Sequence, residues 1–155
     1  MRGGPPDRLN DVKALAFDYY GTIADKRALG SHIERHYPGH GEALAKLWFA
    51  TCQRFCFQNG MMGRYAPWHE LTQSALIFAC AELDLNMPDS LRQELITADA
   101  SAPIYPEAAV ALARLAKSYS LHVLSMGSAW MIQNSQAAAG INNYFASVIT
   151  TEAQR

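Results

Sequence analysis

One short segment near the start of the chain combines a carboxylate, a tight turn and a hydroxyl group. It reads FDYYGT, from Phe17 to Thr22, and it ends a mostly apolar run, VKALAF, at residues 12–17. The run predicts a buried strand of a parallel sheet, and the glycine predicts the turn that follows it. Because open α/β sheets bind ligands at the carboxyl ends of their strands, Asp18 is the first candidate for a reacting group. A plain role for Asp18 as a turn or N-cap residue is the structural alternative.

Two further apolar runs predict strands in the second half of the chain. They are LHVLS at residues 121–125 and ASVIT at residues 146–150, and a segment with helical character precedes each. The first of these helices opens at Pro106 and the second closes at Gly140, as proline and glycine often do at helix ends. Alternating helices and strands predict a parallel α/β sheet. Ser125 closes the second strand, where it could also cap the following helix.

The stretch between these two parts has the apolar spacing of helices throughout. Four helices are expected, at about residues 25–37, 42–58, 68–84 and 88–98. A helical insertion therefore separates the first strand from the rest of the sheet. The sequence predicts an α/β core made of residues 1–24 and 101–155, with a helical cap at residues 25–100.

Composition narrows the classes of partner and compartment. The chain has 13 Lys and Arg against 14 Asp and Glu, without a basic block, which argues against nucleic acid or an anionic membrane surface as the main partner. The N-terminal MRGGPPDRLN is polar and lacks an apolar signal core, and no run is long enough to span a membrane. Three cysteines without a CxxC pair are typical of reduced thiols. We therefore expect a cytoplasmic protein that acts on a small molecule.

Several strings together resemble a known family. FDYYGTIAD resembles the first motif of the haloacid dehalogenase superfamily, specifically of its type II L-2-haloacid dehalogenases. LWFATCQRFCFQNGMMGRY, at residues 47–65, resembles the family's second cap helix and the segment that ends it. PIYP at residues 103–106 resembles the return to the core, and SMGS at residues 125–128 resembles the second motif. The resemblance covers nearly the whole chain and implies a Rossmann-like parallel core with a helical cap inserted after the first strand.

The resemblance also implies a mechanism. Asp18 would attack a carbon that bears a halogen, and water would then cleave the resulting ester. Thr22 and Ser125 would hydrogen-bond the Asp18 carboxylate and hold its angle. The phosphatases of the superfamily carry a second aspartate where this chain has Tyr20. Because Mg²⁺ sites need carboxylate ligands, we expect neither a phosphatase nor a metal or other cofactor at this site.

Two departures from the family pattern make the expected pocket apolar. Phe49 stands where the family has the arginine that binds the substrate carboxylate, and Met126 stands where the family has an asparagine with the same partner. A carboxylate buried without such partners is costly, so we expect haloacids to bind poorly and an apolar ligand to bind better. The residues expected to contact the substrate are aromatic side chains and methionines: Tyr19, Tyr20, Phe49, Met61, Met62, Trp68 and Met126.

A third departure is the absence from this sequence of the lysine of the family's third motif, which by the resemblance would lie just past Arg155.

The sequence thus leaves three hypotheses open. The first is a dehalogenase-like hydrolase acting through Asp18, with the missing groups supplied by another chain. The second is a cyclase or isomerase in which a neutral Asp18 acts as the general acid. The third is a non-catalytic binding or scaffold protein.

The family's sheet also implies an assembly. Its first strand is flanked on one side by strands that follow the third motif, so residues 12–17 are expected to form an open apolar edge. Proteins normally cover such edges. We therefore expect a homodimer or a larger assembly that covers this strand.

The histidines give little sign of chemistry in the sequence. His32, His36 and His40 recur every four residues, but Pro38 and Gly39 interrupt the helix before His40, so the three are not expected to share one face. No metal site is predicted from them. His69 and His122 are expected to be structural or exposed.

Overall fold

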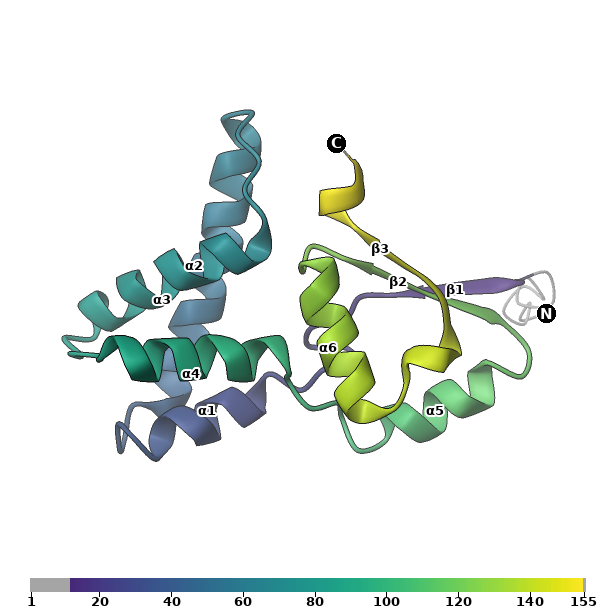
Figure 1. Ribbon diagram of the computed structural model, residues 1–155, viewed down its shortest axis with the longest axis horizontal. Coiled ribbons are helices and arrows are strands. Elements are labelled where there is room, and N and C mark those ends of the chain that lie inside the picture. The colour runs from purple at the N-terminus through teal and green to yellow at the C-terminus, as the bar shows by residue number, and fades with distance from the viewer. Residues whose placement is uncertain (1–11, 155) are drawn as a thin grey trace, which may run out of the picture.

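The chain divides into a sheet with two helices and a separate group of four helices (Figure 1). The computed structural model describes residues 12–154, and the polar N-terminal segment noted above lies outside the described residues. The strands are β1 (Ala14–Phe17), β2 (Ser120–Ser125) and β3 (Phe145–Thr150). The α-helices are α1 (Arg27–Glu34), α2 (Gly41–Met61), α3 (Trp68–Glu82), α4 (Asp89–Ala100), α5 (Ala108–Leu115) and α6 (Ala129–Ala139). Two short 3₁₀ helices, η2 (Asn142–Tyr144) and η3 (Thr151–Gln154), flank β3.

The sheet is parallel throughout, in the order β1-β2-β3. Phe17 of β1 lies opposite Val123 of β2, and Ser125 of β2 lies opposite Thr150 of β3. All three strands therefore end at the same edge of the sheet. This arrangement confirms the predicted α/β fold with helices inserted after the first strand.

The first strand is less buried than the sequence predicted. Its two alanines are exposed, and Leu15 and Phe17 are only partly buried. The reason is its position: among the described residues, β1 pairs with β2 alone and is the edge of the sheet. The central strand is the one with a buried face, through Leu121 and Val123.

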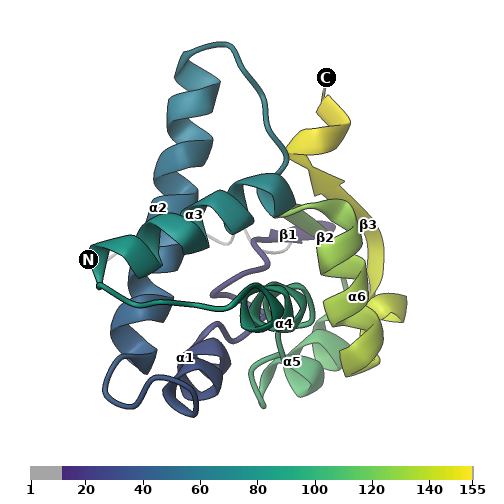
Figure 2. The ribbon, with the colours of Figure 1, turned by 60° about the vertical axis from the view of Figure 1, so that its left-hand side comes forward.

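The four helices between β1 and α5 form one packed group. α2 packs against α1 and α3, and α4 packs against α1 and α3 (Figure 2). The group has its own apolar centre, which includes the fully buried Leu44, Leu76 and Leu95. Trp48 is also buried there, and its indole N–H donates to the carbonyl of Thr72 at 2.8 Å.

The helix boundaries differ from the predicted ones by a few residues. α1 ends at Glu34, before the predicted residue 37, and hydrogen-bonded turns continue the chain as far as Tyr37. α2 continues to Met61, past the predicted residue 58. α6 ends at Ala139, and Gly140 closes it as expected, with a left-handed φ of 67°.

Two chain crossings join the helical group to the sheet, and they lie side by side. The Asp25 N–H donates to the Pro103 carbonyl at 2.7 Å, and the Tyr105 N–H donates to the Ile23 carbonyl at 2.9 Å. These bonds form a short antiparallel bridge between the outgoing and returning chain. The bridge fixes where the helical group stands beside the strand ends.

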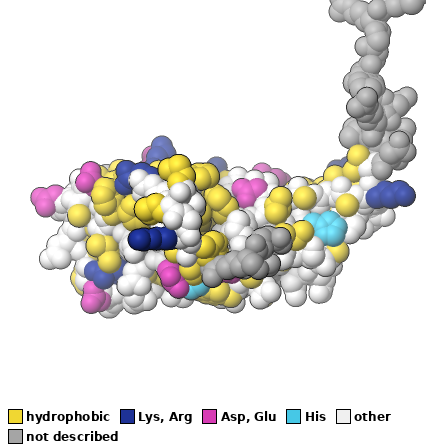
Figure 3. Space-filling view, turned by 90° about the horizontal axis from the view of Figure 1, so that it is seen from above, with side chains coloured by type: hydrophobic (Ala, Val, Ile, Leu, Met, Phe, Trp, Pro, Cys, Tyr) yellow, Lys and Arg dark blue, Asp and Glu magenta, His cyan; other side chains and the backbone are white. Residues whose placement is uncertain are grey.

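The far end of α2 is the most exposed apolar part of this group. Phe57, Met61 and Met62 are all more than half exposed. Apolar side chains are prominent on the face seen from above in Figure 3, among scattered charged ones. No helix among the described residues has the length and apolar composition needed to cross a bilayer.

Candidate active site

Asp18 leaves β1 at the carboxyl end of the sheet. Its Oδ1 accepts the Tyr19 N–H at 2.7 Å, and the side chain is exposed rather than buried. The turn that follows is tight, because the carbonyl of Tyr19 accepts the N–H groups of Ile23 and Ala24 at 2.8 and 2.9 Å. Gly21 has a φ of 87°, a conformation that favours glycine. The turn thus leaves the Asp18 carboxylate accessible at the rim of the sheet.

The end of the neighbouring strand supplies a hydroxyl group. Ser125 is the last residue of β2 and is buried, and its Oγ accepts the Gly127 N–H at 3.2 Å. This bond turns the chain sharply before α6 begins. Ser125 therefore lies next to the position where Asp18 emerges from β1.

A cavity of about 400 Å³ opens at these two strand ends. This volume is within the usual range for small-molecule sites. The lining residues come from the strand ends, from α2 and α3, and from the start of η3: Asp18, Tyr20, Phe49, Gln53, Trp68, Leu124, Ser125, Met126, Gly127 and Thr151. The cavity thus lies between the sheet and the helical group, with one carboxylate in an otherwise uncharged wall.

Tyr20 forms the inner wall of this cavity. Its ring lies so close to Gly127 that a Cβ added there would be 2.6 Å from Cε2 of the ring. On another side, Lys26 Nζ lies 4.3 Å from the ring centroid. Burial, with the neighbouring Asp99 and Tyr19 adding to it, raises the pKa of Tyr20 above its ordinary value, so the phenol stays neutral. Phe49 and Trp68 continue the wall, with ring centroids 5.9 Å apart.

The polar ends of two wall residues are shielded. The Tyr20 hydroxyl and the Trp68 indole N–H are buried and have no hydrogen-bond partner among the described residues. Neither atom is accessible from the cavity as it stands. The aromatic faces of these residues, rather than their polar atoms, therefore make the wall.

An ion pair that the sequence analysis missed lies behind this wall. Lys26, just before α1, pairs with Asp99 near the end of α4, and the two side chains are 18% and 4% exposed. Lys26 Nζ also lies 5.8 Å from the centroid of the Phe49 ring. The separation of 73 positions along the sequence explains why no sequence pattern indicated the pair. Because Asp99 balances its charge, Lys26 does not serve as an unpaired cation for Asp18.

The cavity brings together six of the residues predicted for the site: Asp18, Tyr20, Phe49, Trp68, Ser125 and Met126. Four lining residues were not predicted: Gln53, Leu124, Gly127 and Thr151. The sequence held a signal for Gln53, since it lies one helical turn beyond Phe49 on the same helix. Thr151 had no such signal, because its place depends on how β3 continues past the strand end.

Four of the predicted residues do not line the cavity: Tyr19, Thr22, Met61 and Met62. Tyr19 is fully buried in the core, where its hydroxyl donates to Ser135 Oγ at 2.8 Å. Thr22 is exposed in the turn, and its N–H faces the Tyr19 carbonyl at 3.3 Å. Met61 is 83% exposed and Met62 is 59% exposed. Met61 ends α2 twelve residues beyond Phe49, about 18 Å further along the helix axis, too far to reach the cavity wall.

A larger hollow of about 500 Å³ lies along α1 and α2, beside Lys26, Glu34 and Lys46. Phe49 lines both hollows. The α1–α2 hollow contains neither Asp18 nor another nucleophile at a strand end. We therefore regard the smaller cavity as the candidate active site.

His69, His122 and the three cysteines show no arrangement typical of catalysis. His69 Nδ1 lies 2.9 Å from Ser128 Oγ, and His122 Nδ1 lies 2.8 Å from Ser147 Oγ. The three cysteines are free, and burial raises the pKa of the Cys52 thiol to about 12. Such a thiol stays protonated at neutral pH and is a poor nucleophile.

Comparisons with known proteins identify relatives of one kind. A scan against protein-family models finds no match. The chain is 34% identical to an (S)-2-haloacid dehalogenase of Xanthobacter autotrophicus, over 93% of this chain and 56% of that protein. It is 30% identical to an (S)-2-haloacid dehalogenase of Pseudomonas putida, over 93% of this chain and 64% of the relative. The chain therefore spans less than two thirds of the length of these relatives.

Solved structures agree with the sequence comparison. The L-2-haloacid dehalogenase of Xanthobacter autotrophicus with chloropropionic acid covalently bound matches with a TM-score of 0.85 and 33% identity, over 93% of this chain and 58% of that one. Another L-2-haloacid dehalogenase matches with a TM-score of 0.88 and 29% identity, over 92% of this chain and 65% of that one. The chain is thus a homologue of the L-2-haloacid dehalogenases over 93% of its own length.

Proposed function

We propose that the chain acts on small organic halides through Asp18, which serves as the nucleophile. The observation that carries this proposal is the accessible Asp18 carboxylate at the mouth of a 400 Å³ cavity, next to Ser125 and an aromatic wall. The kinship with haloacid dehalogenases supports it, and so does the covalently bound chloropropionic acid in one relative. We also propose that residues 1–24 and 101–155 act as the core domain and residues 25–100 as the cap that covers the site.

The chemical step needs only one group that reacts. A carboxylate oxygen of Asp18 forms a bond to the halogen-bearing carbon, and the halide leaves with the electron pair of the broken bond. The product is an ester on Asp18. Water then adds to the ester carbonyl, and cleavage returns the Asp18 carboxylate, the alcohol product and a proton. Ser125 lies where its hydroxyl can hold the carboxylate in position for the first step.

The substrate is proposed to be uncharged near the reacting carbon. Phe49 and Met126 both line the cavity, and neither can pair with a substrate carboxylate. Among the described lining residues, Gln53, Ser125 and Thr151 offer polar but uncharged groups. A 2-halo amide or ester therefore suits this cavity better than the corresponding 2-halo acid, since no buried carboxylate is left without a partner.

The test is a comparison of 2-bromopropionate with 2-bromopropionamide, which share one carbon frame. Each is incubated with the parent chain and with the Asp18→Asn variant, and the protein is analysed by intact mass and peptide mapping. We expect an adduct on the peptide that contains Asp18, with the amide reacting faster. Hydroxylamine should release an ester on Asp18 but leave a thioether on Cys56 intact. Halide release in the variant should fall to the amount accounted for by cysteine alkylation and by the reagent alone.

A matched control separates the role of Asp18 from a general loss of carboxylate. Asp84 is exposed and has a φ of 53°, which asparagine also tolerates. Asp84→Asn should form the adduct as the parent does. An adduct at equal yield in Asp18→Asn, or its absence from the parent, would contradict the proposed function.

We also propose that the chain associates with a second copy through β1, in a cytoplasmic protein. The support is the position of β1 as the sheet edge among residues 12–154, with Ala14 and Ala16 exposed. Light scattering should give the mass of a dimer or larger species. Ala14→Lys should yield monomers, since lysine on an edge strand blocks strand pairing. Ala111→Lys, at an exposed position of α5, should leave the dimer or larger species intact. A monomeric parent at all concentrations would contradict this assembly.

A further inference from the structure

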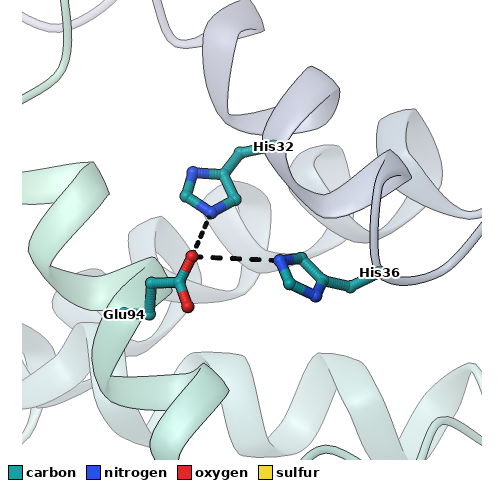
Figure 4. Close-up of side chains that lie close together, drawn as sticks. All are labelled: His32, His36 and Glu94. Atoms are coloured by element: carbon teal, nitrogen blue, oxygen red, sulfur yellow. Dashed lines mark hydrogen bonds and ion pairs between the residues drawn. The ribbon is translucent and has the colours of Figure 1, made fainter.

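Two imidazoles and a carboxylate converge between α1 and α4, away from the Asp18 cavity. His32 and His36 come from α1 and the residues just after it, and Glu94 comes from α4 (Figure 4). Glu94 Oε1 lies 2.6 Å from His32 Nε2 and 3.8 Å from His36 Nε2. The three ligand atoms lie within 4.8 Å of one another. None of the three residues lines the Asp18 cavity.

The packing of the two helices holds these side chains in place. Ile33, next to His32, and Leu95, next to Glu94, are both fully buried and fix how α1 and α4 face each other. The two imidazole rings stack, with centroids 5.8 Å apart and planes 24° apart. The arrangement is therefore set by the helix backbones and not by the flexible side chains alone.

We propose that His32, His36 and Glu94 bind a zinc ion. Imidazole nitrogens and one carboxylate oxygen are ligands that zinc accepts, whereas magnesium and calcium prefer oxygen ligands alone. A tetrahedral zinc with bonds of about 2.0–2.1 Å places its ligand atoms about 3.3 Å apart. The present separations of 2.6 and 3.8 Å from Glu94 Oε1 to the two imidazole nitrogens lie on either side of that spacing. The fourth position faces solvent and takes a water molecule.

A plain ion pair accounts for the cluster less well. One carboxylate oxygen faces two imidazole nitrogens, and direct pairing with His32 at 2.6 Å leaves His36 Nε2 at 3.8 Å, beyond hydrogen-bond distance. A bound zinc ion uses both rings in their neutral form. The side chains of His32, His36 and Glu94 are 20%, 39% and 53% exposed, so an ion reaches them without unfolding of the helices.

The site would fasten the two helices at which the chain enters and leaves the helical group. α1 and α4 already pair through Lys26 and Asp99 near one end, and His32 and Glu94 meet further along the same two helices. Zinc therefore adds a second link between them. Because a ligand that binds only the folded state stabilises it, zinc should raise the melting temperature of the chain.

The test is a calorimetric titration of the full, chelator-treated chain with zinc chloride. We expect one zinc per chain for the parent, and a loss of affinity of at least about tenfold in His32→Ala and in His36→Ala. Glu94→Gln should bind zinc more weakly than the parent. Magnesium chloride should give no binding at this cluster.

His40→Ala is the matched control, because His40 continues the same four-residue spacing but does not belong to the cluster. It should bind zinc as the parent does. Thermal unfolding supplies a second readout: zinc should raise the melting temperature of the parent and of His40→Ala, but not that of the His32→Ala, His36→Ala double variant. Circular dichroism checks that the variants are folded. Equal zinc binding in the parent and the double variant, or no zinc binding by the parent, would overturn the proposal.

Discussion

The strand ends around Asp18 and the interface between α1 and α4 place their polar groups by different means. Asp18 and Ser125 stand at the ends of adjacent parallel strands, and the sheet register alone brings them to one edge. Lys26 meets Asp99 across 73 residues, and His32 meets Glu94 across 62. The first arrangement follows from backbone topology, whereas the second depends on how two helices pack. Substitutions in the two regions should therefore have different consequences.

The two regions also differ in how far their carboxylates are exposed to water. The Asp18 carboxylate is exposed to an open cavity, where water can solvate it. Asp99 is almost fully buried and depends on Lys26 for its partner. The carboxylate proposed as the nucleophile is thus accessible, while the more deeply buried carboxylate is held in an ion pair.

The largest effect is expected when the buried pair loses its cation. Lys26→Met leaves Asp99 without a partner in a buried place, which should cost about 3–5 kcal/mol of unfolding free energy. Urea unfolding followed by circular dichroism measures this loss. The double variant Lys26→Met, Asp99→Leu should recover most of the stability, because an apolar pair leaves no charge unpaired.

Lys46→Met is the control for that substitution. Lys46 pairs with Glu42 one turn away on α2, and both side chains are at least 75% exposed. Its removal should leave the urea midpoint essentially unchanged. If Lys26→Met also left the midpoint unchanged, the distinction between the two regions would be wrong for stability.

A smaller effect is expected at the strand ends, where the packing of one ring would change. Gly127→Ala places a Cβ 2.6 Å from Cε2 of the Tyr20 ring, so the ring must shift away from residue 127. Overpacking of this kind costs about 1–3 kcal/mol, and the shifted ring should also slow ester formation on Asp18. Urea unfolding and the adduct yield measure the two consequences.

Gly60→Ala provides the comparison for this change. An added Cβ at Gly60 meets no atom within 4 Å, and alanine favours the helix that contains it. Stability should therefore stay the same or rise slightly, with the adduct yield unchanged. An equal adduct yield in Gly127→Ala would show that Tyr20 does not shape the cavity.

Much of the fold could be predicted from local patterns. The three apolar runs gave the three strands to within two residues at each end, and Gly140 marked the end of α6. Burial was predicted less well: residues 12–17 have the composition of a buried strand, yet β1 lies at the sheet edge. Composition reports how apolar a strand is, whereas its neighbours decide how much of it is covered.

The candidate site shows the same division. Position in the motif and at strand ends was enough to indicate Asp18, Ser125 and Met126. Met61 was expected at the cavity from the resemblance and its apolar side chain, but it lies exposed at the far end of α2, because neither signal gives its distance along the helix. Tyr19 was misplaced too, since its side chain points from the turn into the core.

The sequence by itself determined the order of helices and strands, the carboxylate at the first strand end and the kinship with haloacid dehalogenases. These features depend on short-range spacing, which the linear chain records directly. Only the tertiary structure decided that Lys26 is matched by Asp99, that Tyr20 packs on Gly127, and that Glu94 joins His32 and His36. Each of these contacts joins segments far apart in the chain, and their distances follow from packing that no local pattern contains.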